Sequence, residues 1–192
     1  MTAIKELPIL FFESALVFEK WLFNHHTELD GLWIKMSKKA SGIVSVTYEE
    51  ALSVALCYGW IDGQRKSFDD TFFIQRFTPR RAKSLWSKRN VGKIATLISQ
   101  GKMQPAGLLE VEAAKQDGRW EAAYASSKNM VFPEDFLKAL AKNKQAQAFF
   151  KTLGKSNLYA IAFRLETAKK PETRQRRFDA LLGMLERGEK FY

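Results

Sequence analysis

Apolar residues recur with helical spacing in four stretches of the first two-thirds of the chain. Ser14 can cap a helix that ends near "NHHTELDG", and Thr47 with Glu50 forms a capping box for a helix that ends near Gly59. The same periodicity predicts helices over residues 91–100 and 105–117, the second opened by a proline. The pattern therefore predicts a largely helical chain.

Alternating apolar and polar residues interrupt these helices at three places. The segment "LWIKM" at residues 32–36 has the alternation of a half-buried strand. The segments "WIDGQRK" and "TFFIQRF" are rich in aromatic and β-branched residues, and only "SFDD" separates them. So short a connection predicts an antiparallel hairpin.

Every stretch after Pro133 has a helical pattern. We expect these helices to pack around five apolar side chains, namely Phe149, Phe150, Phe163, Phe178 and Leu182. About fifteen irregular residues precede them, a length that is typical of a boundary or a functional loop. We therefore predict an α+β fold, mostly helical, with a small antiparallel sheet or hairpin in a mixed part over residues 1–128 and an all-helical module over residues 129–192.

Composition restricts the possible chemistry. The single cysteine, Cys57, cannot form an internal disulfide, and with only two histidines it is poor material for a zinc site. Cys57 falls in an apolar helix, where it is expected to be buried rather than nucleophilic. Neither a glycine-rich phosphate loop nor a nucleophile elbow is found, so we expect no metal and no cofactor. The first residues lack the pattern of a signal peptide or a spanning helix, which predicts a cytoplasmic protein.

The positive charge is concentrated in one region. The net charge is +10, and residues 64–102 contain ten Lys and Arg against two Asp, which is +8 of that total. The segment "RFTPRRAKSLWSKRN", residues 76–90, has six basic residues and no acidic one, with aromatic rings between them. Arginine forks match phosphate and carboxylate groups, and Trp86 offers a flat surface for stacking. The alternative is a solvated basic loop with Trp86 packed in the core.

Two further residues extend this candidate site. Asp62 in "GWIDG" is expected nearly opposite Arg76 in the hairpin, where it either forms a structural pair or orients an arginine toward a ligand. Asn90 can cap the helix predicted at residues 91–100, which would bring a helix N-terminus to the basic loop. The candidate anion-binding residues are Asp62, Arg65, Arg76, Arg80, Arg81, Trp86, Arg89 and Asn90.

A second basic cluster, "RLETAKKPETRQRR", lies near the C-terminus. Arg174 and Arg177 share a helix face, and Arg164 belongs to the preceding helix. Because Glu166 and Glu172 are close in sequence, we expect ion pairs that dock these two helices.

The segments "GWIDG", "RFTPR", "WS" and "ETR" together resemble the YdeI/OmpD-associated family of bacterial proteins, and the end of the chain resembles that family's bacteriocin-protection module. The resemblance runs from about Phe12 to Gly188. It implies a role in survival under antimicrobial peptides and other stress, and association with an outer-membrane porin. It supplies no catalytic residues.

Three functions remain open. The first is a non-enzymatic protection protein that binds an anionic small molecule or an acidic protein partner through residues 62–90. The second is a nucleic-acid-binding protein, with phosphate contacts from Lys and Arg and stacking on Trp86 or Phe77. The third is an enzyme acting on a phosphorylated or carboxylated substrate, with Asp62 as base and Arg76, Arg80 or Arg81 as oxyanion clamp. The oligomeric state stays open.

Overall fold

The computed structural model describes residues 6–192, and these residues divide into two compact units. Unit 1 contains the described residues up to Trp86 and the range Asn90–Ala122, and unit 2 contains Ser87–Arg89 and Ala123–Tyr192. Helices account for 48% of the chain and strands for 14%, so the mostly helical α+β prediction is confirmed.

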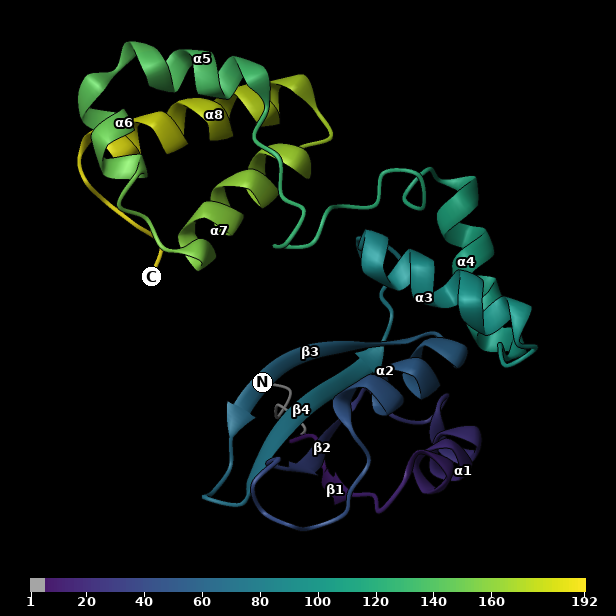
Figure 1. Ribbon diagram of the computed structural model, residues 1–192. Coiled ribbons are helices and arrows are strands. Elements are labelled where there is room, and N and C mark those ends of the chain that lie inside the picture. Colours follow the sequence, from purple (N-terminus) through teal and green to yellow (C-terminus); the bar gives the residue numbers. More distant parts are fainter. Residues whose placement is uncertain (1–5) are drawn as a thin grey trace, which may run out of the picture. The chain divides into compact units, whose positions relative to one another are not determined.

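Unit 1 is built on a four-stranded sheet (Figure 1). Its strands are β1 (Ile9–Phe11), β2 (Leu32–Ser37), β3 (Trp60–Ser67) and β4 (Phe72–Pro79), in the order β1-β2-β4-β3. The predicted hairpin is β3 and β4. The expectation of a purely antiparallel sheet was wrong, because β1 pairs in parallel with β2. A strand of three residues has too few positions to show alternation in a sequence.

Four helices complete unit 1, namely α1 (Ala15–His25), α2 (Tyr48–Cys57), α3 (Lys88–Ser99, which begins among residues assigned to unit 2) and α4 (Pro105–Gln116). The caps of α1 and α2 are those that the sequence predicts. The Ser14 side chain accepts a hydrogen bond from Val17 N–H, and Thr47 with Glu50 forms the complete capping box. Local sequence signals therefore set where α1 and α2 begin.

Helices α1 and α2 pack on one face of the sheet, which we call the inner face. Residues directly opposite each other on neighbouring strands share a face, so Leu32, paired with Phe77, and Ile34, paired with Gln75, belong to it. Leu32, Phe77 and Ile34 are fully buried. The Phe18 ring of α1 packs 6.1 Å from the Phe77 ring, between ring centroids. The inner face is thus the core of unit 1.

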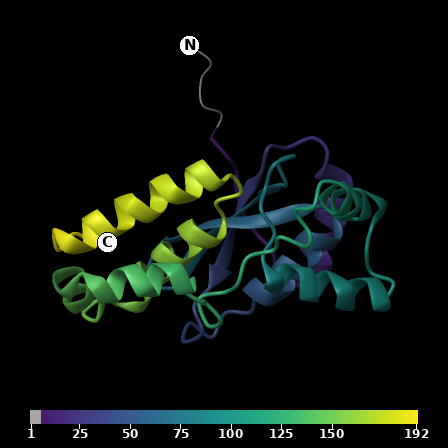
Figure 2. The ribbon, with the colours of Figure 1, turned by 90° about the horizontal axis from the view of Figure 1, so that it is seen from above.

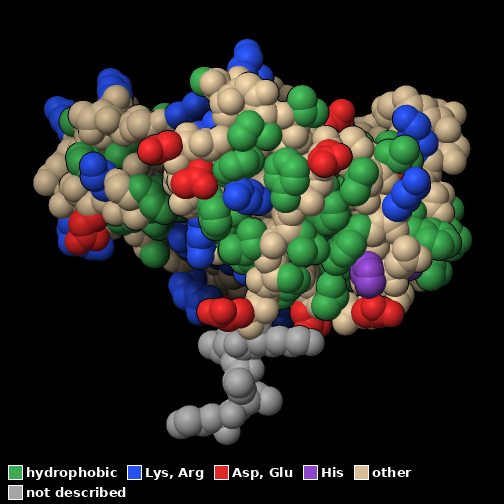
Figure 3. All heavy atoms as spheres, turned by 90° about the horizontal axis from the view of Figure 1, so that it is seen from below, with side chains coloured by type: hydrophobic (Ala, Val, Ile, Leu, Met, Phe, Trp, Pro, Cys, Tyr) green, Lys and Arg blue, Asp and Glu red, His purple; other side chains and the backbone are tan. Residues whose placement is uncertain are grey.

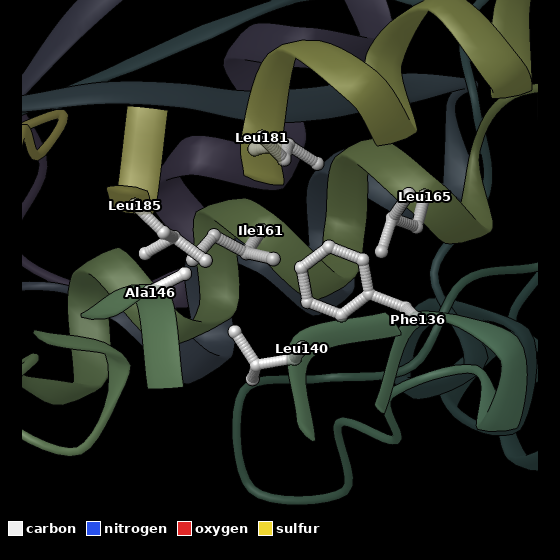
Figure 4. Packing of buried hydrophobic residues seen from close by; sticks show 7 residues of the cluster. All are labelled: Phe136, Leu140, Ala146, Ile161, Leu165, Leu181 and Leu185. Carbon is white, nitrogen blue, oxygen red and sulfur yellow. The ribbon is translucent and has the colours of Figure 1, made fainter. Parts of the chain in front are cut away.

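Unit 2 contains the helices α5 (Glu134–Lys142), α6 (Lys144–Phe150), α7 (Lys155–Glu166) and α8 (Pro171–Glu186), as the sequence predicts. Figure 2 shows α8 as one long helix beside its shorter neighbours, and it packs against both α6 and α7. Figure 4 shows side chains of all four helices meeting in one cluster: Phe136, Leu140, Ala146, Ile161, Leu165, Leu181 and Leu185.

The prediction of which side chains form the centre of this core was wrong in detail. Phe149, Phe150, Phe178 and Leu182 are only partly buried around the cluster, and Phe163 instead packs edge-to-face on Tyr124, 4.9 Å away. The fully buried ring is that of Phe136, whose burial contributes roughly 1.5–3 kcal/mol. Helical spacing identifies an apolar stripe, but the stripe's centre depends on how the helices cross.

Candidate functional site

Asp62 is held inside unit 1 by a residue that the sequence analysis did not single out. The Tyr48 hydroxyl, at the first position of α2, donates a hydrogen bond of 2.8 Å to Asp62 Oδ2. Asp62 lies opposite Phe77 on the inner face, and not opposite Arg76 as expected, because the hairpin pairs Lys66 with Ile74 rather than with Phe72; a bulge between Asp62 and Arg65 then shifts the register by one residue. A bulge of this kind cannot be inferred from alternation alone.

Arg80 and Trp86 form a buried stack. The Arg80 guanidinium carbon lies 3.5 Å from the centroid of the Trp86 ring, and Arg80 Nη1 donates to the Leu85 carbonyl at 3.3 Å. The Trp86 ring is 1% exposed and also meets the Trp120 ring edge-on at 4.9 Å. A ligand would reach the Trp86 ring only if Arg80 moved, so this pair stabilises the fold around the loop.

The other residues of the segment are spread out. Arg81 is exposed in a turn in which its N–H donates to Ser84 Oγ at 3.1 Å. Arg89 is exposed in the first turn of α3. Asn90 is not the cap of this helix, since α3 begins at Lys88 and Asn90 is buried inside it. The expected N-terminus at residue 91 is therefore displaced by three residues.

Arg65 and Arg76 lie on opposite faces of the sheet. Arg65 is opposite Gln75 on the inner-face side, and its guanidinium carbon stacks 3.7 Å from the centroid of the Phe73 ring. Arg76 is opposite Trp33 and shares the other face with it. The strand pairing therefore does not bring these two arginines together around one small anion.

The face that carries Arg76 has an unusual composition, and we call it the outer sheet face. Strand pairing assigns to it Ile9, Phe11, Trp33, Lys35, Ser37, Ile61, Lys66, Phe72, Ile74, Arg76 and Thr78. The strand residues that define this face thus combine aromatic rings with three cations and contribute no carboxylate.

On this face each lysine covers an aromatic ring. Lys66 Nζ lies 4.9 Å from the centroid of the Trp33 ring, and Lys35 Nζ lies 4.1 Å from that of Phe72. The Phe11 ring meets the Phe72 ring edge-on at 6.0 Å. Trp33 is half-buried, whereas Phe11 is 41% exposed. Cations and rings are thus held next to each other at a surface.

The Arg76 side chain lies against the backbone of the bulge in β3. Its Nε is buried and has no hydrogen-bond partner among residues 6–192. A Cβ added at Gly63 would lie 3.0 Å from this Nε, so the absence of a side chain there leaves space for the guanidinium. Arg76 is consequently positioned by packing rather than by a protein carboxylate.

Asp69 lies in the turn between β3 and β4, three residues from both Lys66 and Phe72. Its carboxylate accepts hydrogen bonds from the N–H groups of Thr71 and Phe72. Partial burial disfavours its charge, but these two hydrogen bonds, with Lys35 and Lys38, hold the pKa of Asp69 below its usual value. The Asp69 carboxylate is thus engaged in hydrogen bonds within the turn between β3 and β4.

Other surfaces and groups offer less chemistry. Figure 3 shows hydrophobic side chains spread over the side seen from below. Leu16, Val17 and Phe23 of α1 are exposed. Cys57 is buried, and burial raises the pKa of its thiol to about 11, so it is a protonated core residue near neutral pH. Among the described residues no helix is long and apolar enough to cross a membrane.

Two family models match the chain. Residues 10–110 match "Domain of unknown function (DUF8412)", a range that holds β2, β3, β4 and all of β1 except Ile9. Residues 129–188 match "Bacteriocin-protection, YdeI or OmpD-Associated", a range that holds α5 to α8. The YdeI/OmpD-associated resemblance is thus confirmed, with its match in the C-terminal part, whereas the sheet matches the other model. No curated protein and no solved structure matches the chain.

The first match covers more than half of the chain, and the second covers the helices of unit 2. The chain therefore belongs to the family described as Domain of unknown function (DUF8412), and its C-terminal part, residues 129–188, is similar to the bacteriocin-protection, YdeI or OmpD-associated family.

Proposed function

We propose that this chain is a non-enzymatic protein of bacterial stress protection that binds an anionic ligand at the outer sheet face, in the cytoplasm. The observation that carries the proposal is the gathering of Lys35, Lys66 and Arg76 on one face of three paired strands. Like charges held together repel one another, and a bound anion would relieve that repulsion.

The arrangement favours binding over catalysis. The enzyme hypothesis places Asp62 and one of Arg76, Arg80 or Arg81 at the same substrate. Asp62 and Arg76 belong to opposite faces of the sheet, and the Arg80 guanidinium is stacked on the buried Trp86 ring. Asp62 is also engaged by the Tyr48 hydroxyl at 2.8 Å. The family of the C-terminal part supports a role in survival under antimicrobial stress.

Titration calorimetry with tripolyphosphate tests the proposal. The Lys66→Ala and Arg76→Ala variants should each bind several-fold more weakly than the wild type, since each loses one positive charge at the ligand. Lys83→Ala is the matched control, because Lys83 is an exposed cation of the basic segment outside the outer sheet face.

Equal binding by all three variants and the wild type would contradict the proposed site. A complementation assay then links binding to protection: a deletion strain carrying Lys66→Ala with Arg76→Ala should survive an antimicrobial peptide less well than one carrying Lys83→Ala. Cell fractionation tests the proposed compartment.

A further inference from the structure

The outer sheet face has features that a site for a small anion does not need. A small anion is gripped by donors that converge on one point, whereas Lys35 and Lys66 lie over different aromatic rings. Trp33 is four residues along β2 from Ser37, which pairs with Phe72, so the two rings are separated by roughly 13 Å along the strands. The face thus presents two aromatic platforms, each with its own cation.

We infer that the ligand of the outer sheet face is single-stranded nucleic acid, whose bases stack on Trp33 and Phe72 while its phosphates contact Lys35, Lys66 and Arg76. This inference rests on the proposed function, because it requires that the face bind an anion. Sheet surfaces with aromatic rings bind unpaired bases by stacking, and a groove or face of basic residues follows the backbone.

The lysines that cover the rings do not prevent stacking. An exposed cation over an aromatic ring contributes only about a two- to fivefold effect on an equilibrium. A base stacked on an aromatic side chain contributes roughly a 5- to 100-fold effect on affinity. A base can therefore displace Lys66 from Trp33, and the displaced ammonium group is then beside the phosphate that follows the base.

Arg76 gives this surface a fixed cation. Its Nε is buried without a hydrogen-bond partner among the described residues, and the side chain lies against Gly63. Packing therefore restricts the guanidinium before any ligand arrives, which lowers the entropic cost of binding a phosphate.

Base stacking also separates single strands from the duplex. In a double helix the bases are already stacked on one another, and only their edges face the grooves. The aromatic rings of the outer sheet face would then have nothing to stack on, and only phosphate contacts would remain. We therefore expect short DNA and RNA single strands to bind more tightly than a duplex of the same length.

Fluorescence anisotropy with labelled oligonucleotides of about 12 residues tests the inference on the full-length protein. The probes are an oligothymidylate, an oligouridylate, an abasic strand with the same number of phosphates, and a duplex. We expect the two base-containing strands to bind at least about tenfold more tightly than the abasic strand and the duplex. Trp33→Ala should remove about tenfold of that affinity for the oligothymidylate while leaving the affinity for the abasic strand unchanged.

Matched variants separate stacking from charge and from misfolding. Phe23→Ala removes an exposed ring of α1 and should leave affinity unchanged, whereas Trp33→Tyr keeps a ring on the outer sheet face and should retain most of it. Lys66→Gln should weaken binding to every strand and reduce the salt slope by about 0.7, measured from roughly 50 to 200 mM salt. Circular dichroism confirms that each variant is folded.

The outcomes are distinct. Equal affinity for the abasic strand and the base-containing strands, together with binding of tripolyphosphate, would overturn this inference and leave the proposed anion-binding function standing. Binding to anionic lipid vesicles without binding to any oligonucleotide would overturn it in favour of a membrane surface. If no probe binds and tripolyphosphate does not bind either, both the inference and the proposed function are wrong.

Discussion

Arg174 and Arg76 are both partly exposed, yet their surroundings differ. Arg174 of α8 donates from Nη1 and Nη2 to the two carboxylate oxygens of Asp135, at 2.7 and 2.9 Å. Arg177 donates to the Arg164 carbonyl at 2.9 Å. These arginines tie α8 to α5 and α7, as the predicted docking role requires, although Glu166 instead accepts the Ala125 N–H. Among residues 6–192 Arg76 forms no such ion pair with a carboxylate.

The Arg174–Asp135 pair predicts a stability difference that depends on pH. The hydrogen bond from Arg174 holds the pKa of Asp135 below its usual value. A lowered pKa in the folded state stabilises the protein above the unfolded pKa, about 3.9, and the effect is lost as the pH falls through the folded pKa. Arg174→Ala should therefore lower the Tm slightly at about pH 7, and the difference should shrink below about pH 4.

Thermal unfolding of the wild type, Arg174→Ala and Arg176→Ala over a pH series measures this pH-dependent difference in Tm. Arg176 is exposed on the same helix, so its variant controls for the loss of a charge alone. A Tm difference for Arg174→Ala that persisted unchanged to low pH would assign its origin to packing rather than to the ion pair.

At the scale of elements, α4 packs on the end of α2 by backbone contact. Gly107 of α4 is buried, and a Cβ there would overlap the carbonyl group of Cys57. The Gln104 N–H also donates to the Cys57 carbonyl at 3.1 Å. The first turn of α4 therefore approaches α2 more closely than any other residue at position 107 would permit.

This contact predicts opposite effects at two helical glycines. Gly107→Ala must push α4 away from α2 and should destabilise the protein by about 1–3 kcal/mol. Gly92→Ala in α3 meets nothing within 4 Å and should stabilise it by up to about 1 kcal/mol, since alanine favours the helix. Urea unfolding measures both values, and similar effects at the two positions would contradict the close packing of α4 on α2.

At the scale of the whole molecule, each unit has its own hydrophobic core. The core of unit 2 comes from α5 to α8, with Phe136 at 0% exposure. Ser87, which forms a bridge with Tyr124 ahead of α5, belongs to unit 2 as well. A domain with its own core can in general fold alone.

We accordingly predict that residues 123–192 expressed alone are helical and unfold cooperatively on heating. Far-ultraviolet circular dichroism during a temperature ramp measures both properties. Phe136→Ala in the same fragment should lower its stability by about 3–5 kcal/mol, because it leaves a cavity at the centre of the core. A fragment that is unfolded, or that melts without a transition, would show that unit 2 depends on the rest of the chain.

Much of the fold could be predicted from residues that are close in sequence. Ser14 and the Thr47–Glu50 box start their helices, and the short "SFDD" turn joins β3 to β4, where Asp69 receives two backbone hydrogen bonds. Such signals act over a few residues, so the sequence contains them in full. For the same reason the segment rich in Lys and Arg was evident as a source of positive charge.

The arrangement of those charges depended on tertiary structure. The register of β3 on β4 determines which of Arg65 and Lys66 shares a face with Arg76, and a shift of one residue would exchange them. Pairing of β2 with β4 brings Trp33 and Lys35 to Arg76 from about forty residues away in sequence. The sequence alone determined the helices, the β3–β4 hairpin and the concentration of positive charge in residues 64–102. The long-range register decided which cations share a face, because the face of a side chain follows from strand pairing.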